Sequence, residues 1–476
     1  MSATAGANHN SVDASPTKRF FVDMLTRDIE LQDAVLDLLD NCVDGLMRSS
    51  GPYDSSAEKP YTGHWARITF SEDRFTIADN CGGISRKLAE DSAFRMGRVA
   101  AARVFDANIP TVGMYGIGMK RAIFKMGRRS TVTSNTKKEA FRVDIPESWF
   151  SKASEDDWKL PIKTLQPSPS SIGTSIEVSR LDPAVAKEFA NPAGFAQTFR
   201  STVSQQYSLI IEKGFQVFID NRPVKPLPLE FRSVDLANYQ EGIAPFMFSG
   251  KIDGVDVDMH VGFYKPIPDD AEIEAQDEGT FSADEAGWTV ICNDRVVLYH
   301  DRTRLTGWGE ASVPSFHNQF ISISGVVHFR CNDATKLPVT TTKRGINASS
   351  DVYAQAKDKM RQGLKVFTSY TNQLKKDRTR RDEIFAETGT VDLRTLKQAS
   401  SRPPATSWTK DRKFEGKTFV PQLPRVVDSN LKTIRFLRPQ DQIAKVAQYV
   451  LDDPNAKPSE VGEECFDRLL KEAKRR

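Results

Sequence analysis

The pattern of apolar and polar positions predicts an amphipathic helix near the start of the chain. At about 100° per residue, its apolar positions form one stripe: Leu31, Val35, Leu38, Leu39, Cys42 and Leu46. The opposite face is acidic or amidic: Asp33, Asp37, Asp40, Asn41 and Asp44. No Lys or Arg occurs between Asp28 and Met47, although like charges at helical spacing destabilise by roughly 0.2–0.5 kcal/mol per pair. Two interpretations remain open, a solvated acidic face or a face whose missing cation is a bound metal such as Mg²⁺.

The pattern then changes to that of a mixed α/β domain. Segments of strand character occur at 66–70, 75–78, 130–135, 141–145 and 174–180. The segment 86–105 has helical character, and glycines precede a further helix that carries Ile123, Phe124 and Met126. The predicted fold class is α/β (α+β), with a flexible tail at 1–17 and a first domain at 18–181. Strand-rich sequence and a helix around 195–212 predict a second α/β domain at 182–362. A basic helix at 363–387, a linker at 388–432 and a helical C-terminal unit at 433–476 complete the expected organisation.

Composition narrows the class of protein. The chain has 476 residues and a net charge of +3, which suits a globular protein of two or three domains. No apolar run approaches the roughly 18–20 residues that span a bilayer, so we expect a cytoplasmic protein without membrane contact. The cysteines are five in number and scattered, which excludes paired zinc-site spacing and a disulfide framework.

Four further segments carry candidate chemistry. Asp79 to Ile84, DNCGGI, follows a strand and by itself is typical of a tight turn. GMYGIGMK, 113–120, places glycines ahead of a helix start and Lys120, a pattern suited to phosphate binding or to a structural turn. It is not a Walker A loop, because no Ser or Thr follows Lys120. Gly173-Thr174 precedes a strand, and Lys343 lies in PVTTTKRGIN, where an exposed turn lysine is the plain alternative.

The order of these motifs resembles the GHKL ATPase superfamily, which contains gyrase B, MutL, the ninety-kilodalton heat-shock chaperones and histidine kinases. Within it, the likeness is greatest to MORC-type heads, and it covers about residues 20–377. The resemblance implies a Bergerat-type nucleotide-binding α/β sandwich followed by a ribosomal-S5-like transducer domain. It also places a mobile ATP lid at 85–112.

The resemblance assigns roles residue by residue. Asp37 matches the general base, Asn41 the Mg²⁺ ligand one turn later, Asp79 the acceptor of the adenine amino group, and Lys343 the transducer lysine that reaches ATP. The expected catalytic residues are therefore Asp37 and Lys343. The expected nucleotide contacts are Asn41, Asp79, Gly83, Ile84, Gly113, Tyr115, Gly116, Ile117, Gly118, Met119, Lys120 and Thr174.

Two departures from the family pattern stand out. Cys81 occupies the usual first glycine of the second motif, so the local turn is expected to differ. Asp37 stands where relatives generally have Glu, and its shorter side chain predicts slow ATP hydrolysis. A sensor kinase is disfavoured, since only His9 precedes the nucleotide domain and it lies in the polar tail.

Two functions remain. The first is a Mg²⁺-dependent ATPase whose ATP-dependent homodimer acts as a clamp or switch on DNA, in repair, silencing or defence against foreign DNA. The basic segment KKDRTRR, 375–381, suits this reading but is also typical of a solvated helix end. The alternative is a chaperone-like or signalling ATPase with a protein client.

Overall fold

The computed structural model describes most of the chain, in two compact units at 1–424 and 425–476 that are treated separately below. The described residues are 17–49, 58–95, 109–111, 113, 116–150, 158–268, 273, 285–340, 343–375, 377–401, 408–425, 434 and 436–474. The predicted tail, apart from residue 17, and half of the predicted lid, 96–108 and 112, lie outside them. No helix among the described residues combines the length and the apolar character needed to cross a membrane.

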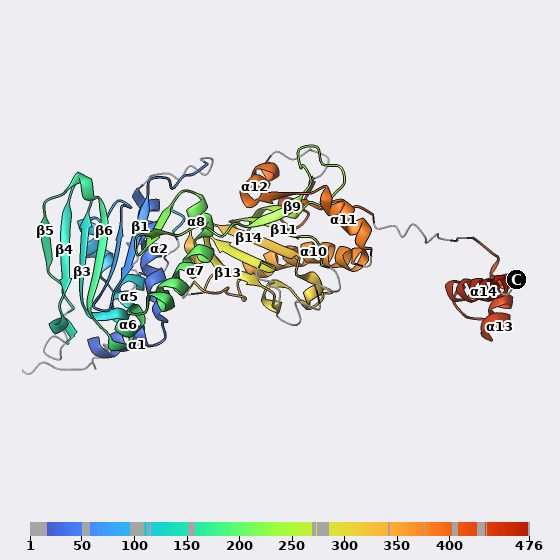
Figure 1. The fold of residues 1–476 in the computed structure, drawn as a ribbon, viewed down its shortest axis with the longest axis horizontal. Helices are drawn as coiled ribbons and strands as arrows, with labels where there is room; N and C mark the ends of the chain where they lie inside the picture. Colours follow the sequence, from blue (N-terminus) through green and yellow to red (C-terminus); the bar gives the residue numbers. More distant parts are fainter. Residues whose placement is uncertain are drawn as a thin grey trace, which may run out of the picture. The chain divides into compact units, whose positions relative to one another are not determined.

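The first part of the larger unit is built on an eight-stranded sheet of order β5-β4-β3-β6-β2-β1-β7-β8 (Figure 1). Its strands are β1 Trp65–Phe70, β2 Arg74–Asp79, β3 Gly127–Asn135, β4 Ala140–Ile145, β5 Ile162–Leu165, β6 Gly173–Leu181, β7 Gln216–Ile219 and β8 Arg222–Pro223. Neighbours pair antiparallel except β1 and β7, which are parallel. The mixed α/β fold class predicted from the sequence is confirmed.

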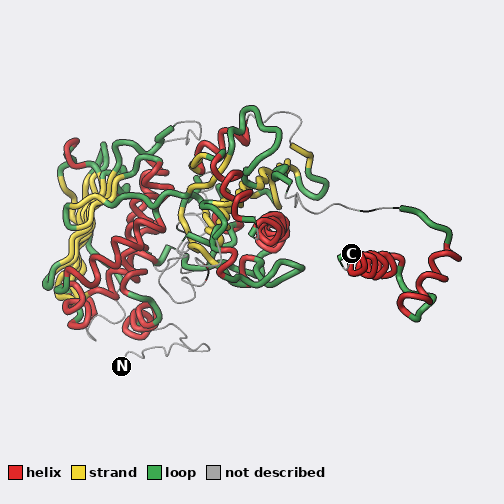
Figure 2. The backbone as a smooth tube through the Cα atoms, turned by 45° about the vertical axis from the view of Figure 1, so that its right-hand side comes forward, coloured by secondary structure: helices red, strands yellow, loops and turns green. Residues whose placement is uncertain are grey.

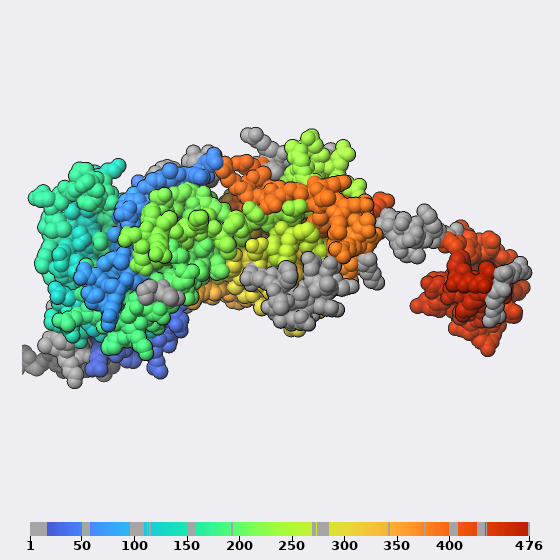
Figure 3. Space-filling model, viewed as in Figure 1, coloured from blue at the N-terminus to red at the C-terminus, as the bar shows by residue number. Residues whose placement is uncertain are grey.

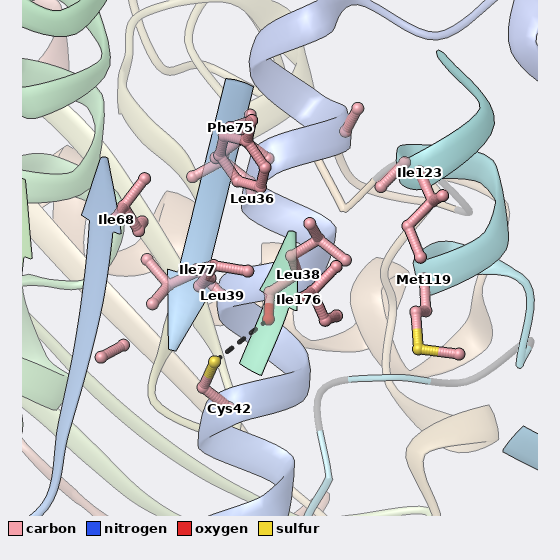
Figure 4. Close-up of a cluster of buried hydrophobic side chains, with 14 of the residues drawn as sticks. Leu36, Leu38, Leu39, Cys42, Ile68, Phe75, Ile77, Met119, Ile123 and Ile176 are labelled. Carbon is pink, nitrogen blue, oxygen red and sulfur yellow. Dashed lines mark hydrogen bonds between the residues drawn. The ribbon is translucent and has the colours of Figure 1, made fainter. Parts of the chain in front are cut away.

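Helices cover one face of this sheet (Figure 2). They include α1 Lys18–Arg27, α2 Leu31–Ser49, the short α3 Arg86–Leu88, α5 Gly118–Met126, α6 Pro183–Phe189, α7 Gln197–Gln206 and α8 Ser208–Glu212, with π-helical turns at Ala89–Ala93 and Pro192–Ala196. Figure 4 shows Leu38 and Leu39 of α2 beside Ile77 of β2 and Ile176 of β6. The apolar stripe predicted for 31–46 is buried in this core, which holds α2 against the sheet.

A second sheet of seven strands has the order β13-β12-β14-β11-β10-β17-β16. Its strands are β10 Phe246–Ile252, β11 Val255–Phe263, β12 Gly287–Cys292, β13 Arg295–Asp301, β14 Ile323–Arg330, β16 Trp408–Lys410 and β17 Glu415–Phe419. The long helix α10 Asp351–Leu374 packs on β10, β11 and β14. Beyond it come α11 Arg378–Ala386 and α12 Leu393–Ser401, and β9 Glu230–Ser233 pairs with β15 Gly389–Asp392. Helices α7 and α8 contact β13, and their side chains (green) lie beside the second sheet (yellow) in Figure 3.

The structure divides the chain differently from the sequence pattern in two places. Strands β7 and β8 lie beyond the expected boundary at 181, yet they extend the first sheet, because Val217 and Ile219 share its core. Much of the stretch expected to be a linker, 388–432, is regular structure: β15 and α12 form there, and β17 pairs with β10. Its polar composition concealed strands that are stabilised mainly by pairing with distant partners.

The smaller unit contains two helices, α13 Gln440–Leu451 and α14 Pro458–Ala473, which pack on each other. Asp452 ends α13 in the left-handed conformation with φ 61°. Ala447 and Val461 are buried, whereas Tyr449 and Leu469 are exposed.

Candidate active site

A cavity of about 1060 Å³ gathers most of the residues that sequence motifs indicated. It lies where α2, the end of β2, the start of α5 and the Lys343 loop meet. The predicted residues that line it are Asp37, Asn41, Asp79, Gly83, Ile84, Gly113, Gly116, Ile117, Gly118, Met119, Lys120, Thr174 and Lys343. The remaining predicted contact, Tyr115, lies outside the described residues.

The acidic face of α2 is buried, with Asp37, Asp40 and Asp44 each no more than 5% exposed. A solvated face is therefore wrong for these three residues. The cations that face Asp37 and Asp40 come from distant parts of the chain: Arg121, Arg295 and Lys343. Asp44 accepts a hydrogen bond from the backbone N–H of Gly113 at 2.8 Å, which ties α2 to the glycine-rich segment.

Both carboxylate oxygens of Asp37 are engaged by cations. Arg121 Nη2 lies 2.5 Å from Oδ2, and Lys343 Nζ lies 3.3 Å from Oδ1. Gly118, at the start of α5, lies so close that a Cβ there would be 3.2 Å from Asp37 Cγ. The missing side chain at 118 thus allows α5 to approach the carboxylate.

Asp40 is the centre of a buried cluster that joins three elements. Lys343 Nζ lies 2.7 Å from its Oδ2, Arg295 Nε of β13 lies 3.0 Å from its Oδ1, and the Tyr207 hydroxyl donates to the same Oδ1. Burial acts to raise the pKa of Asp40, but the Lys343 and Arg295 charges outweigh it and hold the pKa below the ordinary value. Burial alone would lower the pKa of Lys343, yet Asp40 and Asp37 raise it above its usual range. The cluster is therefore ionised and mutually dependent.

Asp79 ends β2 and also lines the cavity. Its Oδ1 accepts hydrogen bonds from the backbone N–H groups of Cys81 at 2.7 Å and Thr174 at 3.3 Å. Burial raises the pKa of Asp79 to about 6, although these bonds act in the other direction. Close backbone packing surrounds it, because a Cβ on Gly173 would lie 1.8 Å from the Asp79 carbonyl oxygen. The backbone thus fixes Oδ1 of Asp79, and the neighbouring Cys42 and Cys81 thiols also hydrogen-bond to its carboxyl group.

The glycine-rich segment leads into α5 and positions Lys120. Gly116 has φ 67°, a left-handed conformation that favours glycine. Lys120 Nζ donates to the Ala93 carbonyl at 2.9 Å and to that of Gly116, and burial lowers its pKa to about 8. The N–H groups of the first turn of a helix and a nearby ammonium together favour a bound anion.

Lys343 reaches the cavity from a tight turn. An isolated bridge joins Val339 and Ile346, and the N–H of Lys343 donates to the Thr340 carbonyl at 3.0 Å. Lys343 itself has φ 57°, an uncommon conformation for a residue with a Cβ. The turn thereby presents one ammonium group to the acidic face of α2.

Asn41 is the predicted magnesium ligand, and its side chain is exposed within the lining of the cavity. No group of three or more His, Cys, Asp and Glu side chains in the described part of the chain is arranged to hold a metal ion. Mg²⁺ commonly keeps several waters and binds one or two protein oxygens together with substrate phosphates. A single amide oxygen at Asn41 fits that chemistry.

Residues 29–177 match the family model described as histidine kinase-, DNA gyrase B-, and HSP90-like ATPase. This segment is similar to ATPase domains of the GHKL superfamily. The match includes Asp37, Asp79 and the glycine-rich segment, and it supports ATP binding by this domain. It ends before Lys343. No curated protein matches the chain.

Several residues of the site were missed by sequence reasoning. Arg121 directly follows Lys120, and its position one turn into the helix after the glycines was the only local signal. Asp44 lies one turn after Asp40 and belonged to the acidic face, but its backbone partner is distant. Arg295 and Tyr207 carried no motif, because only the contact of α7 and β13 with α2 brings them to Asp40.

Proposed function

We propose that this protein is a MORC-like GHKL ATPase that binds Mg²⁺-ATP, hydrolyses it slowly and uses ATP to control association of two copies of the chain. The observation that carries the proposal is the entry of Lys343 into the cavity that holds Asp37 and Asp79. Lys343 lies outside the segment that matches the ATPase family, so it links another part of the chain to the nucleotide.

The two ends of the cavity suit the two ends of ATP. The Asp79 carboxylate, which lines the cavity, is an acceptor for the adenine amino group. Lys120 and the N–H groups at the start of α5 suit the phosphates, which they attract by charge and by hydrogen bonds. Asn41 would hold Mg²⁺, which neutralises phosphate charge when it is bound.

Asp37 is the best candidate for the general base, but its two oxygens face Arg121 and Lys343 at 2.5 and 3.3 Å. A base must lie within about 2.6–3.2 Å of the water whose proton it accepts, directly or through one more water. Movement of Lys343 from Asp37 towards a γ-phosphate would free Oδ1 for that water. Hydrolysis would then require both the triphosphate and a rearranged loop.

The same movement would connect ATP to the rest of the molecule. Lys343 and Arg295 both come from beyond the matched domain, and both contact Asp40. A γ-phosphate that attracts Lys343 changes this shared cluster, whereas ADP does not. A charge-assisted contact of about 1.5–3 kcal/mol shifts a two-state equilibrium by roughly ten- to a hundredfold.

Light scattering and small-angle X-ray scattering test this proposal on the full chain. With a non-hydrolysable ATP analogue we expect a compact dimer, and with ADP or no nucleotide we expect the open or monomeric form. Lys343→Ala should keep nucleotide binding within a few fold and lose the conversion. Lys163→Ala, which removes a lysine paired with Asp144 on the surface, serves as the control. Identical profiles in all nucleotide states would refute the proposed control by ATP.

DNA is the client we favour, in repair, silencing or defence against foreign DNA. The support is the basic character of 375–381 and the MORC-like motif order. A DNA mobility shift that requires nucleotide and weakens with salt is the expected result. Turnover that a protein client stimulates, without any DNA shift, would favour the chaperone-like or signalling alternative.

A further inference from the structure

The loop that carries Lys343 contacts α2 with two consecutive basic residues. Lys343 Nζ contacts Asp37 and Asp40, as described above. Arg344 forms an ion pair with Asp33, and its Nη2 donates to Gln32 Oε1 at 3.0 Å. Asp33 lies one turn before Asp37, so the loop contacts two successive turns of the same helix.

The two side chains line different cavities. Lys343 lines the active-site cavity, whereas Arg344 lines a second cavity of about 690 Å³. Arg344 and Asp33 are partly exposed, with side-chain exposures of 31% and 12%. The Gln32 amide in turn donates to the Thr202 hydroxyl of α7. Arg344 is thus attached to the first domain outside the space that we assign to nucleotide.

The backbone conformation of the loop explains why a second contact with α2 matters. Lys343 has φ 57°, which a residue with a Cβ adopts only when its surroundings impose it. The loop's own hydrogen bonds, from Lys343 N to Thr340 O and from Thr340 N to Gly345 O, are both 3.0 Å long and shape the turn. These two bonds lie within the loop and do not hold it against α2. Arg344, the residue after Lys343, holds the loop there through its contacts with Asp33 and Gln32.

We propose that Arg344 is a positioning residue that fixes the Lys343 loop on α2, so that the Lys343 ammonium lies within reach of a γ-phosphate. This inference rests on the proposed role of Lys343. Arg344 touches neither the expected nucleotide position nor Asp37, and it acts only through the residue beside it.

The consequence is a specific defect in distinguishing ATP from ADP. Loss of the Arg344 contact leaves the adenine and α5 contacts intact, so ADP affinity stays unchanged. A less ordered Lys343 pays more conformational entropy to meet the γ-phosphate, so affinity for an ATP analogue falls. Because exposed and half-exposed ion pairs are weak, we expect the affinity ratio of analogue to ADP to fall about two- to fivefold in Arg344→Ala.

Calorimetric titration of the full chain with a non-hydrolysable ATP analogue and with ADP measures that ratio. Asp33→Asn should reproduce the Arg344→Ala defect, and the double variant should add nothing to either single variant, since both remove one contact. Arg344→Lys should restore part of the ratio. Arg330→Ala is the matched control, because Arg330 pairs with Asp258 at similar exposures of 42% and 14%, away from the cavity lining.

Three results would overturn the inference. Arg344→Ala with the wild-type ratio would show that the loop is positioned without it. Equal losses of analogue and ADP affinity would indicate a merely structural role. Additive losses in the double variant would separate Arg344 from Asp33. Lys343→Ala separates a failure of the proposed function from a failure of this inference. If Lys343→Ala keeps the wild-type ratio of affinities, the proposed role of Lys343 fails, and the role of Arg344 fails with it. If Lys343→Ala lowers the ratio and Arg344→Ala does not, only the role of Arg344 is refuted.

Discussion

Asp37 is the residue on which catalysis depends in our proposal. Asp37→Ala removes the candidate base and the partner of Arg121, but it leaves the Asp79 and Lys120 ends of the cavity intact. We expect ATP binding to persist and phosphate release to fall to background. Asp23→Ala, at an exposed position of α1 where Asp23 pairs with Arg19, is the comparison variant and should retain phosphate release. Wild-type phosphate release by Asp37→Ala would place the base elsewhere.

Two other residues predict how nucleotide affinity varies with pH. Burial raises the pKa of Asp79 to about 6 and lowers that of Lys120 to about 8. Nucleotide favours the ionised forms of both, so affinity should be highest between these values. It should fall below pH 6 as Asp79 gains a proton, and above pH 8 as Lys120 loses one.

Variants assign the two limbs of this pH profile. Asp79→Asn keeps the Oδ1 acceptor for Cys81 and Thr174, should weaken ATP binding by about 1–3 kcal/mol, and should abolish the acidic limb. Lys120→Ala should abolish the alkaline limb. Calorimetry across pH compares the wild type with both variants, and the titration of ATP itself is common to all three proteins. A pH profile of affinity that is unchanged in either variant would contradict the assignment of that limb.

At the scale of elements, the turn after β2 depends on a glycine that no other residue replaces without strain. Gly83 has φ 74°, and a Cβ there would lie 2.5 Å from the Asn135 carbonyl oxygen of β3. Gly63 has a similar φ of 88° but open space around the Cβ position. Gly83→Ala should therefore destabilise more than Gly63→Ala, for which a left-handed backbone alone costs of order 1–3 kcal/mol. Thermal denaturation compares the two, and equal losses would show that the β3 contact yields freely.

At the scale of the whole molecule, a second buried cluster joins the two sheets. Asp294, between β12 and β13, accepts from the Tyr61 hydroxyl at 2.6 Å and pairs with Lys213 at 2.5 Å. Burial opposes ionisation of Asp294, but Lys213 and His328 hold its pKa well below the ordinary value. The cluster therefore stabilises the fold at neutral pH, and this contribution is lost as pH falls below the ordinary range of aspartate.

Removal of Asp294 should weaken the whole larger unit. Asp294→Ala leaves Lys213 without its buried carboxylate, which costs about 3–5 kcal/mol for a buried pair. Asp144→Ala breaks pairs with Arg142 and Lys163 at the surface and should cost at most about 1 kcal/mol. Urea denaturation at pH 7 measures both. Similar midpoints for the two variants would show that the Asp294 cluster contributes little to stability.

The sequence by itself determined the features that depend on neighbours along the chain. The apolar stripe of 31–46 predicted helix α2, because helical periodicity is local. The strand before Asp79 predicted the turn that follows it, and the glycines before Lys120 predicted a helix start. Both predictions are local, because glycine permits backbone conformations that other residues rarely adopt. The motif order indicated the GHKL superfamily, which the family match at 29–177 supports.

Only the tertiary structure decided which residues meet the acidic face of α2. Arg295 and Lys343 lie hundreds of positions from Asp40, and their contacts depend on how the second sheet and its loops pack on α2. The same limit applies to β7 and β17, whose pairing partners β1 and β10 are remote in sequence. The local sequence shows that the acidic side chains of α2 need a compensating charge if they are buried. Which residue supplies that charge depends on long-range packing, which local patterns do not encode.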